Sequence, residues 1–244
     1  MYLNEFFQNR NQPPEKRLRE VMMDESYIHQ HYHRNNDSMW NPNDDQDLQY
    51  GKAPAKGRRY CFAAAIKGPD PMGNGTPRWV PGMVWAFCPQ KTGDHNGDYN
   101  EVFNSESFVE WWRTQLLPNL HQPSLIMLDN AAYHKVRGAH VPKVGWMKKA
   151  DLQEYLEGKG VEFDRAFSTI ILRSIVKEFI AVIEPAEIVR LAEAEGHRVL
   201  FTPPYHSDFQ PIELVWTLMK GNVGRQYSMT TTLEMVFDWL MHKF

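Results

Sequence analysis

Three acidic residues occupy positions from which carboxylate groups commonly carry out chemistry. Asp24 directly follows a short apolar stretch, and we predict a strand that ends at Asp24. Asp129 follows four consecutive apolar residues, and Glu213 lies in the first turn of a predicted helix that comes after a strand. Because these residues are far apart in the chain, only tertiary structure can bring their side chains to one point.

The chemistry that suits such a cluster is two-metal phosphoryl transfer. Clustered carboxylates repel one another unless a divalent cation neutralises them. Oxygen ligands without cysteine favour Mg²⁺ or Mn²⁺. Two such ions can activate a water or a 3′-hydroxyl and stabilise the leaving oxygen of an in-line displacement, which is chemistry that a nucleic-acid backbone can undergo.

Composition narrows the classes of protein. The chain has 244 residues, of which 42% are hydrophobic and 23% charged, so it can bury a sizeable core and is not disordered as a whole. Its net charge of −3 means that any nucleic-acid partner must meet a local basic patch. Cys61 and Cys88 are too few for a disulfide framework or a thiolate zinc site, and they suit a reducing compartment. Since no apolar run approaches the roughly 18 residues of a membrane span, we expect no membrane partner, and we expect no small-molecule cofactor.

Hydrophobic patterns and breaker residues predict the elements that position the three carboxylates. We predict antiparallel neighbouring strands over 58–66 and 79–88, with Pro81 placing the second at an edge or a bulge. Residues 124–128 predict a strand that is buried on both faces and ends at Asp129. A further strand is predicted over 198–201, and helices are predicted over 104–118, 151–156, 164–182, 185–195 and 211–219.

A basic stretch follows the second acidic position. Residues 135–149 contain five basic side chains and no acidic one, with Trp146 among them. This composition makes the stretch a candidate surface for the DNA backbone, although a plain solvated face is an equally open interpretation. The candidate DNA-binding residues are Lys135, Arg137, Lys143, Lys148 and Lys149.

Several other polar residues have structural roles as alternatives to catalytic or metal-binding ones. Glu25 is assigned a structural role, and Glu213 could serve a capping box instead of a metal. Asn130 and His134 are expected to support the site through hydrogen bonds, although His134 could also contact metal or DNA. The alternating His29, His31 and His33 lack a fourth zinc ligand, the loop residues Asp44, Asp45 and Asp47 do not match a calcium loop, and Asp208 is expected to cap a turn.

Two segments resemble known sequence blocks. LIMLDNAAYH (125–134) and FTPPYHSDFQPIELVW (201–216) resemble the two most recognisable blocks of the Tc1/mariner and bacterial IS630-like DDE transposases, and MMDESYIHQHYHRNNDSMW (22–40) is similar to their first block. The resemblance implies an α/β, RNase H-like fold with a mixed five-stranded sheet flanked by helices. It also implies metal-dependent DNA strand cleavage and transfer, with Asp24, Asp129 and Glu213 as the catalytic and metal-binding triad.

The chain departs from that family in three respects. Gln210 stands where most relatives have Asn, and because Gln is a weaker N-cap we expect a looser start to the following helix. The step from Asp129 to Glu213 is longer than usual, which we interpret as a helix-rich insertion over 135–198 within one catalytic domain, 1–244. The residues before Asp24 are too few for the helix-turn-helix module that reads transposon ends, so we expect none here.

Three functions therefore stand as hypotheses. The leading one is a DDE transposase catalytic domain that acts on transposon ends and target DNA with two Mg²⁺ or Mn²⁺ ions, and whether it forms a homodimer stays open. The second is a decayed or repurposed transposase-derived protein that binds DNA without turnover. The third is an RNase H-like nuclease that cuts RNA–DNA hybrids. The first predicts residence in the nucleus for a eukaryotic host and in the cytoplasm otherwise.

Overall fold

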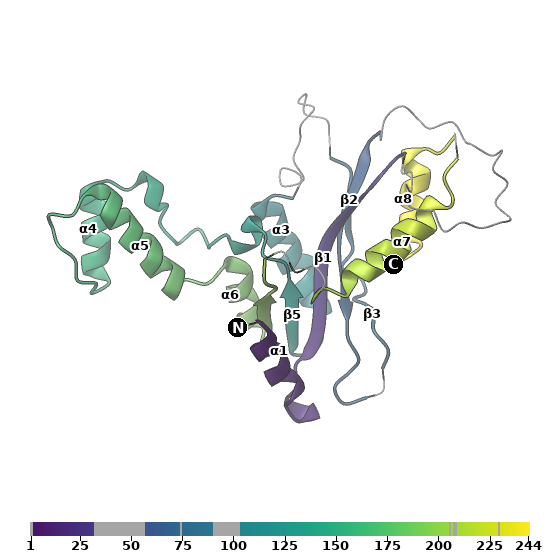
Figure 1. Ribbon diagram of the computed structural model, residues 1–244, viewed down its shortest axis with the longest axis horizontal. Coiled ribbons are helices and arrows are strands. Elements are labelled where there is room, and N and C mark those ends of the chain that lie inside the picture. Colours follow the sequence, from purple (N-terminus) through teal and green to yellow (C-terminus); the bar gives the residue numbers. More distant parts are fainter. Residues whose placement is uncertain are drawn as a thin grey trace.

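A mixed six-stranded sheet forms the centre of the computed structural model (Figure 1), which describes residues 2–31, 57–73, 75–89, 103–204, 206, 209–228 and 230–244. The strand order is β3-β2-β1-β5-β6, with β4 also paired to β2. β1 and β2 are antiparallel, whereas β5 lies parallel to both β1 and β6. The strands are β1 (Arg19–His29), β2 (Arg59–Lys67), β3 (Arg78–Trp79), β4 (Trp85–Phe87), β5 (Ser124–Leu128) and β6 (Arg198–Phe201).

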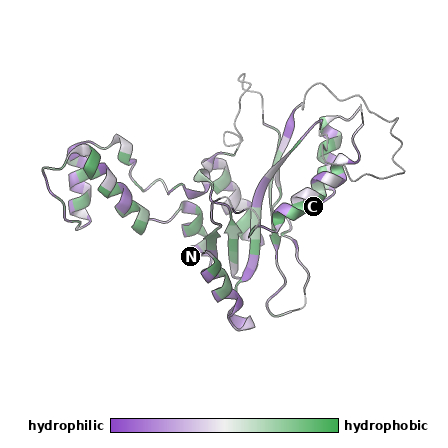
Figure 2. Cartoon of the chain, viewed as in Figure 1, coloured by the Kyte–Doolittle hydropathy of each residue, from purple (hydrophilic) through white to green (hydrophobic). Residues whose placement is uncertain are grey.

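β5 is the central buried strand that the sequence predicted. All five of its residues are buried, and it is hydrophobic along most of its length (Figure 2). Ile126 and Leu128 face the main core, whereas Leu125 and Met127 face a smaller cluster that contains Tyr2 of α1. Helices therefore cover β5 on both faces, which explains its uninterrupted apolar run.

β1 is longer than predicted, and the prediction that it ends at Asp24 is wrong. The strand continues to His29 because residues after Asp24 pair with β2, from Glu25 opposite Ala63 to His29 opposite Arg59. Glu25 is buried although it is charged. An apolar residue at this position would have indicated that the strand continues. Asp24 consequently lies inside β1, just past the last pair that β1 forms with β5.

The predicted edge strand over 79–88 is divided in two. β3 pairs with one end of β2 and β4 pairs with another stretch of it, both antiparallel as predicted. Between them, Pro81 lacks an amide hydrogen and Gly82 adopts a φ of +74°, a conformation that favours glycine. The six strands thus correspond to the five expected ones, with the edge strand interrupted by a turn.

Most of the predicted helices are present, but their boundaries differ from the predicted ones. Of the two residues that the sequence offers as a cap for α3, Asn104 and Ser105, Asn104 is the cap, because its side-chain oxygen accepts a hydrogen bond of 2.9 Å from the amide of Ser107. α5 begins only at Thr169, after the cap Ser168, and both α1 and α8 were missed. The helices are α1 (Tyr2–Arg10), α3 (Ser105–Trp111), α4 (Lys149–Gly158), α5 (Thr169–Ile183), α6 (Glu187–Ala194), α7 (Ile212–Gly224) and α8 (Leu233–Met241).

Residues 136–186 form a helical arm that extends away from the sheet (Figure 1). α4 and α5 pack against each other there and share their own apolar cluster, which includes Leu152, Leu172 and Val176. α6 belongs to the predicted insertion in sequence but packs with the main core through Ile188 and Ala192. No helix in the described ranges is long and apolar enough to cross a membrane.

Candidate active site

One pocket of about 640 Å³ is lined by all three of the predicted acidic residues. Asp24 comes from β1, Asp129 directly follows β5, and Glu213 lies in the first turn of α7. Asn130 and Lys135 also line the pocket. Residues that are distant in sequence therefore line one pocket at the carboxyl end of a parallel strand, which is where α/β sheets commonly place functional groups.

Asp24 is a buried carboxyl group held by α7. Its Oδ2 accepts a hydrogen bond of 2.9 Å from the indole nitrogen of Trp216. Burial raises the pKa of Asp24 well above its usual value, and the nearby carboxylates of Glu25 and Glu213 raise it further. Trp216 is part of the core, and its hydrogen bond also fixes the orientation of this carboxyl group.

His134 lies between two carboxylates, those of Glu25 and Asp129. Its Nε2 is hydrogen-bonded at 2.9 Å to Oε1 of Glu25, and its Nδ1 forms an ion pair at 2.9 Å with Oδ1 of Asp129. The contact at Nδ1 is electrostatic, since that nitrogen makes no hydrogen bond within the described part of the chain, and both carboxylates favour the protonated ring. Burial alone would lower the pKa of His134, but the two carboxylates outweigh it and raise the pKa to about 10.

Asp129 is held in the ionised state. Burial acts to raise its pKa, but the contact with His134 and a hydrogen bond of 2.9 Å from the amide of Ala131 together lower it. Both contacts use Oδ1. The pocket therefore combines one carboxyl group that resists ionisation, Asp24, with one that favours it.

Sequence reasoning missed two contributors to this site. Glu25, to which we assigned a structural role, is the buried partner of His134. Lys220 lies on α7 and interacts electrostatically with Glu213 and Asp24, although burial lowers its pKa. The spacing of Glu213, Trp216 and Lys220 by three and four residues, which places them on one helical face, was a signal that could have identified Lys220.

Gln210 does not cap the last predicted helix. The residue at the cap of α7 is Pro211, which supplies no side-chain hydrogen bond, so the expected weak capping by Gln210 is wrong. Gln210 is instead buried and lines the pocket. Its amide nitrogen has no hydrogen-bond partner in the described part of the chain, which leaves a donor available at the pocket wall.

The donor set fits a hard divalent cation, although no metal site is ready-made. Among the described residues, no three His, Cys, Asp or Glu side chains are grouped closely enough to hold an ion. The three carboxylates nevertheless share one pocket, and their repulsion raises the pKa of Asp24. A cation would relieve that repulsion, and oxygen ligands of this kind suit Mg²⁺ or Mn²⁺.

The five basic residues predicted to bind DNA fall into two groups. Lys135 lines the acidic pocket, and together with Arg137 and Lys143 it also lines a second groove at the base of the arm. Lys148 and Lys149 lie outside both hollows, at the start of α4.

The remaining polar predictions concern the histidines that follow Asp24 and several aspartates in loops. His29 ends β1 and His31 lies in the turn that follows, so the strand alternation of the three histidines does not extend to His31. His33, Asp208 and the loop residues Asp44, Asp45 and Asp47 lie outside the described residues.

Comparison with protein families supports the chemical interpretation of this pocket. The model of the DDE superfamily endonuclease family matches residues 62–234, a span that includes Asp129, Glu213 and the whole helical arm. The match begins after Asp24. No curated protein matches the chain significantly. Since the family match covers well over half of the sequence, and the mixed sheet flanked by helices is consistent with an RNase H-like DDE fold, the chain belongs to the DDE superfamily endonucleases.

Proposed function

We propose that this chain is the catalytic domain of a Tc1/mariner-like transposase that cleaves and joins DNA strands. The single observation that carries the proposal is the pocket lined by Asp24, Asp129 and Glu213, which come from three separate elements. In this proposal the three carboxylates would hold two Mg²⁺ or Mn²⁺ ions. The ions would supply the activated nucleophile and stabilise the leaving oxygen.

The surrounding residues prepare the carboxylates for that task. Trp216 orients Asp24 through Oδ2, and His134 holds Asp129 through Oδ1. Lys135 places a cation at the pocket, where it can neutralise a DNA phosphate. The buried amide of Gln210 can donate to an oxygen of the substrate that enters the pocket.

The helical arm fits the proposal as an insertion between the second and third carboxylates. It leaves the sheet after Lys135 and returns at α6, so its base adjoins the pocket. We propose that it extends the DNA-binding surface of the catalytic domain.

Asp129→Asn is expected to abolish DNA cleavage. Purified protein with Mg²⁺ or Mn²⁺ should nick or join duplex DNA, and EDTA should stop the reaction. The asparagine variant keeps the shape of the side chain but loses the negative charge that a cation requires, so cleavage should fall to background. A gel assay of plasmid nicking measures this.

Asp238→Asn provides the matched control, because Asp238 is exposed on α8 and lies outside the pocket. This variant should cleave DNA like the wild type, and circular dichroism should show the same fold for all three proteins. Cleavage that survives in the Asp129 variant would remove the assignment.

The lack of a ready-made metal site among the described residues favours one alternative, a transposase-derived protein that binds DNA without turnover. Calorimetric titration separates the two functions. Binding of Mn²⁺ by the wild type, and its loss in the Asp129→Asn variant, supports the enzyme. Absence of Mn²⁺ binding together with salt-dependent DNA binding supports the alternative.

A further inference from the structure

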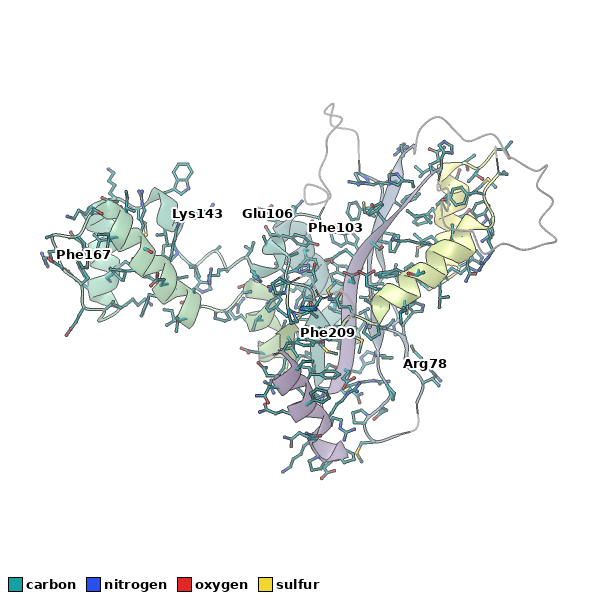
Figure 3. The ribbon with its side chains drawn as sticks, in the orientation of Figure 1. Arg78, Phe103, Glu106, Lys143, Phe167 and Phe209 are labelled. Carbon is teal, nitrogen blue, oxygen red and sulfur yellow. The ribbon has the colours of Figure 1, made fainter. Side chains whose placement is uncertain are left out.

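A groove of about 1060 Å³ lies at the base of the helical arm, between the chain that leaves the sheet and α5. Its lining contains four cations, Lys135, Arg137, Lys143 and Lys177, and no carboxylate. Lys143, which Figure 3 labels on the arm, and Lys177 are both exposed, and neither forms an ion pair within the described part of the chain. The groove therefore presents positive charge that the rest of the chain leaves available for an anionic partner.

One side chain, that of Lys135, lines both the arm groove and the acidic pocket. A DNA strand that leaves the pocket can therefore pass Lys135 and enter the groove. The lining of the groove contains no carboxylate that would repel its phosphates. The next cations along the groove are Arg137 and Lys143. Arg137 is held in place because its Nε donates a hydrogen bond of 3.0 Å to the carbonyl oxygen of Glu184.

The groove also has an apolar component that a duplex would not use. Trp146 lines it and is 87% exposed, close to the apolar side chains of Val144 and Ile180. Bases inside a duplex are stacked on one another, so the face of an exposed indole can stack only on an unpaired base. Cations that follow a backbone, combined with an aromatic platform, are typical of surfaces that bind single strands.

We propose that this arm groove binds single-stranded DNA, with one unpaired base stacked on Trp146 and with Lys143 and Lys177 neutralising the neighbouring phosphates. The inference rests on the proposed function for the source of the strand, which is DNA that is opened or cut in the adjoining pocket. The binding itself requires no cleavage, so it can be measured separately.

The test measures the affinity of the full chain for a labelled single-stranded oligonucleotide and for a duplex of the same length, by fluorescence anisotropy in EDTA. Wild-type protein should bind the single strand more tightly. Trp146→Ala should weaken single-strand binding about tenfold, because one stacking contact is lost. Trp146→Phe should retain most of the affinity, and duplex binding should change little in either variant.

The lysines are tested through the salt dependence of single-strand binding. Lys143→Gln and Lys177→Gln should each reduce the slope of log affinity against log salt concentration by about 0.7, because each removes one phosphate contact. Lys159→Gln is the matched control, since Lys159 is also exposed on the arm but does not line the groove. This variant should bind like the wild type.

Several results would overturn the proposal. These are an unchanged affinity in Trp146→Ala, an equal loss of duplex and single-strand binding in that variant, or a preference of the groove for a poly-glutamate peptide over DNA. Failure of the proposed function gives a different pattern. If the protein binds single strands through Trp146 but does not cut DNA, the groove proposal stands and only the proposed catalytic function fails.

Discussion

Glu25→Ala is expected to lower the free energy of unfolding by about 3 kcal/mol, because it removes the buried partner of a buried cation and leaves that cation paired only with the partly exposed Asp129. The charge in question is the His134 imidazolium, whose ring is almost fully buried and lies between Glu25 and Asp129. The measurement is chemical denaturation near neutral pH. DNA cleavage should also fall, because His134 would no longer hold Asp129 in a fixed orientation.

Glu110→Ala is the matched control for this substitution. Glu110 also pairs with a cation, Arg113, but both side chains are 58% exposed. Exposed pairs contribute about 0–1 kcal/mol, so this variant should stay close to the wild type. Equal losses of stability in the two variants would show that the buried pair of Glu25 and His134 has no special role.

The pH dependence of stability should follow the charge on His134. Its pKa rises from 6.5 to about 10 on folding, so the folded state binds its proton more tightly than the unfolded state. The resulting stabilisation is fully present below about pH 6.5 and is lost as the pH rises toward 10. In Glu25→Ala, stability should fall less between pH 6.5 and pH 10, because one of the carboxylates that raise the pKa of His134 is absent. Denaturation at a series of pH values measures this.

Asp24→Asn is expected to raise stability while it abolishes DNA cleavage. The pKa of Asp24 is raised in the folded state, so ionisation above about pH 4 favours the unfolded chain. Asparagine removes that cost, and its side-chain oxygen can still accept the hydrogen bond from Trp216. A gain of about 1 kcal/mol would raise the Tm by about 2–4 °C for a chain of this length.

Thermal unfolding with and without Mg²⁺ tests both halves of this prediction. In EDTA at neutral pH the Asp24→Asn variant should melt above the wild type, and the difference should disappear below about pH 4. Added Mg²⁺ should stabilise the wild type, because a cation that binds the folded state shifts the folding equilibrium toward it. It should not stabilise the variant, which lacks one of the carboxylates that would bind the cation. A variant that melts below the wild type, or that still responds to Mg²⁺, would contradict the proposed role of Asp24.

Hydrophobic patterns and helix-capping residues in the sequence predicted much of the secondary structure. The continuous apolar run of 124–128 predicted a strand that is buried on both faces and ends at Asp129, and the structure confirms it. Asn104 and Ser105 both suited the cap of the helix that follows by residue type, and the structure shows that Asn104 is the cap. The sequence was misleading at β1, because Glu25 and Ser26 are buried polar residues that interrupt the apolar pattern beyond Asp24.

The sequence by itself determined the strands, most of the helices, several of their boundaries and the three candidate carboxylates. Only the tertiary structure decided that Glu25 and Asp129 share His134, that Lys220 lies near the pocket and that Lys135 joins the pocket to the arm groove. The physical reason is that local periodicity records which side chains a segment buries. It does not record which distant residue supplies the charge or hydrogen bond that a buried polar group requires.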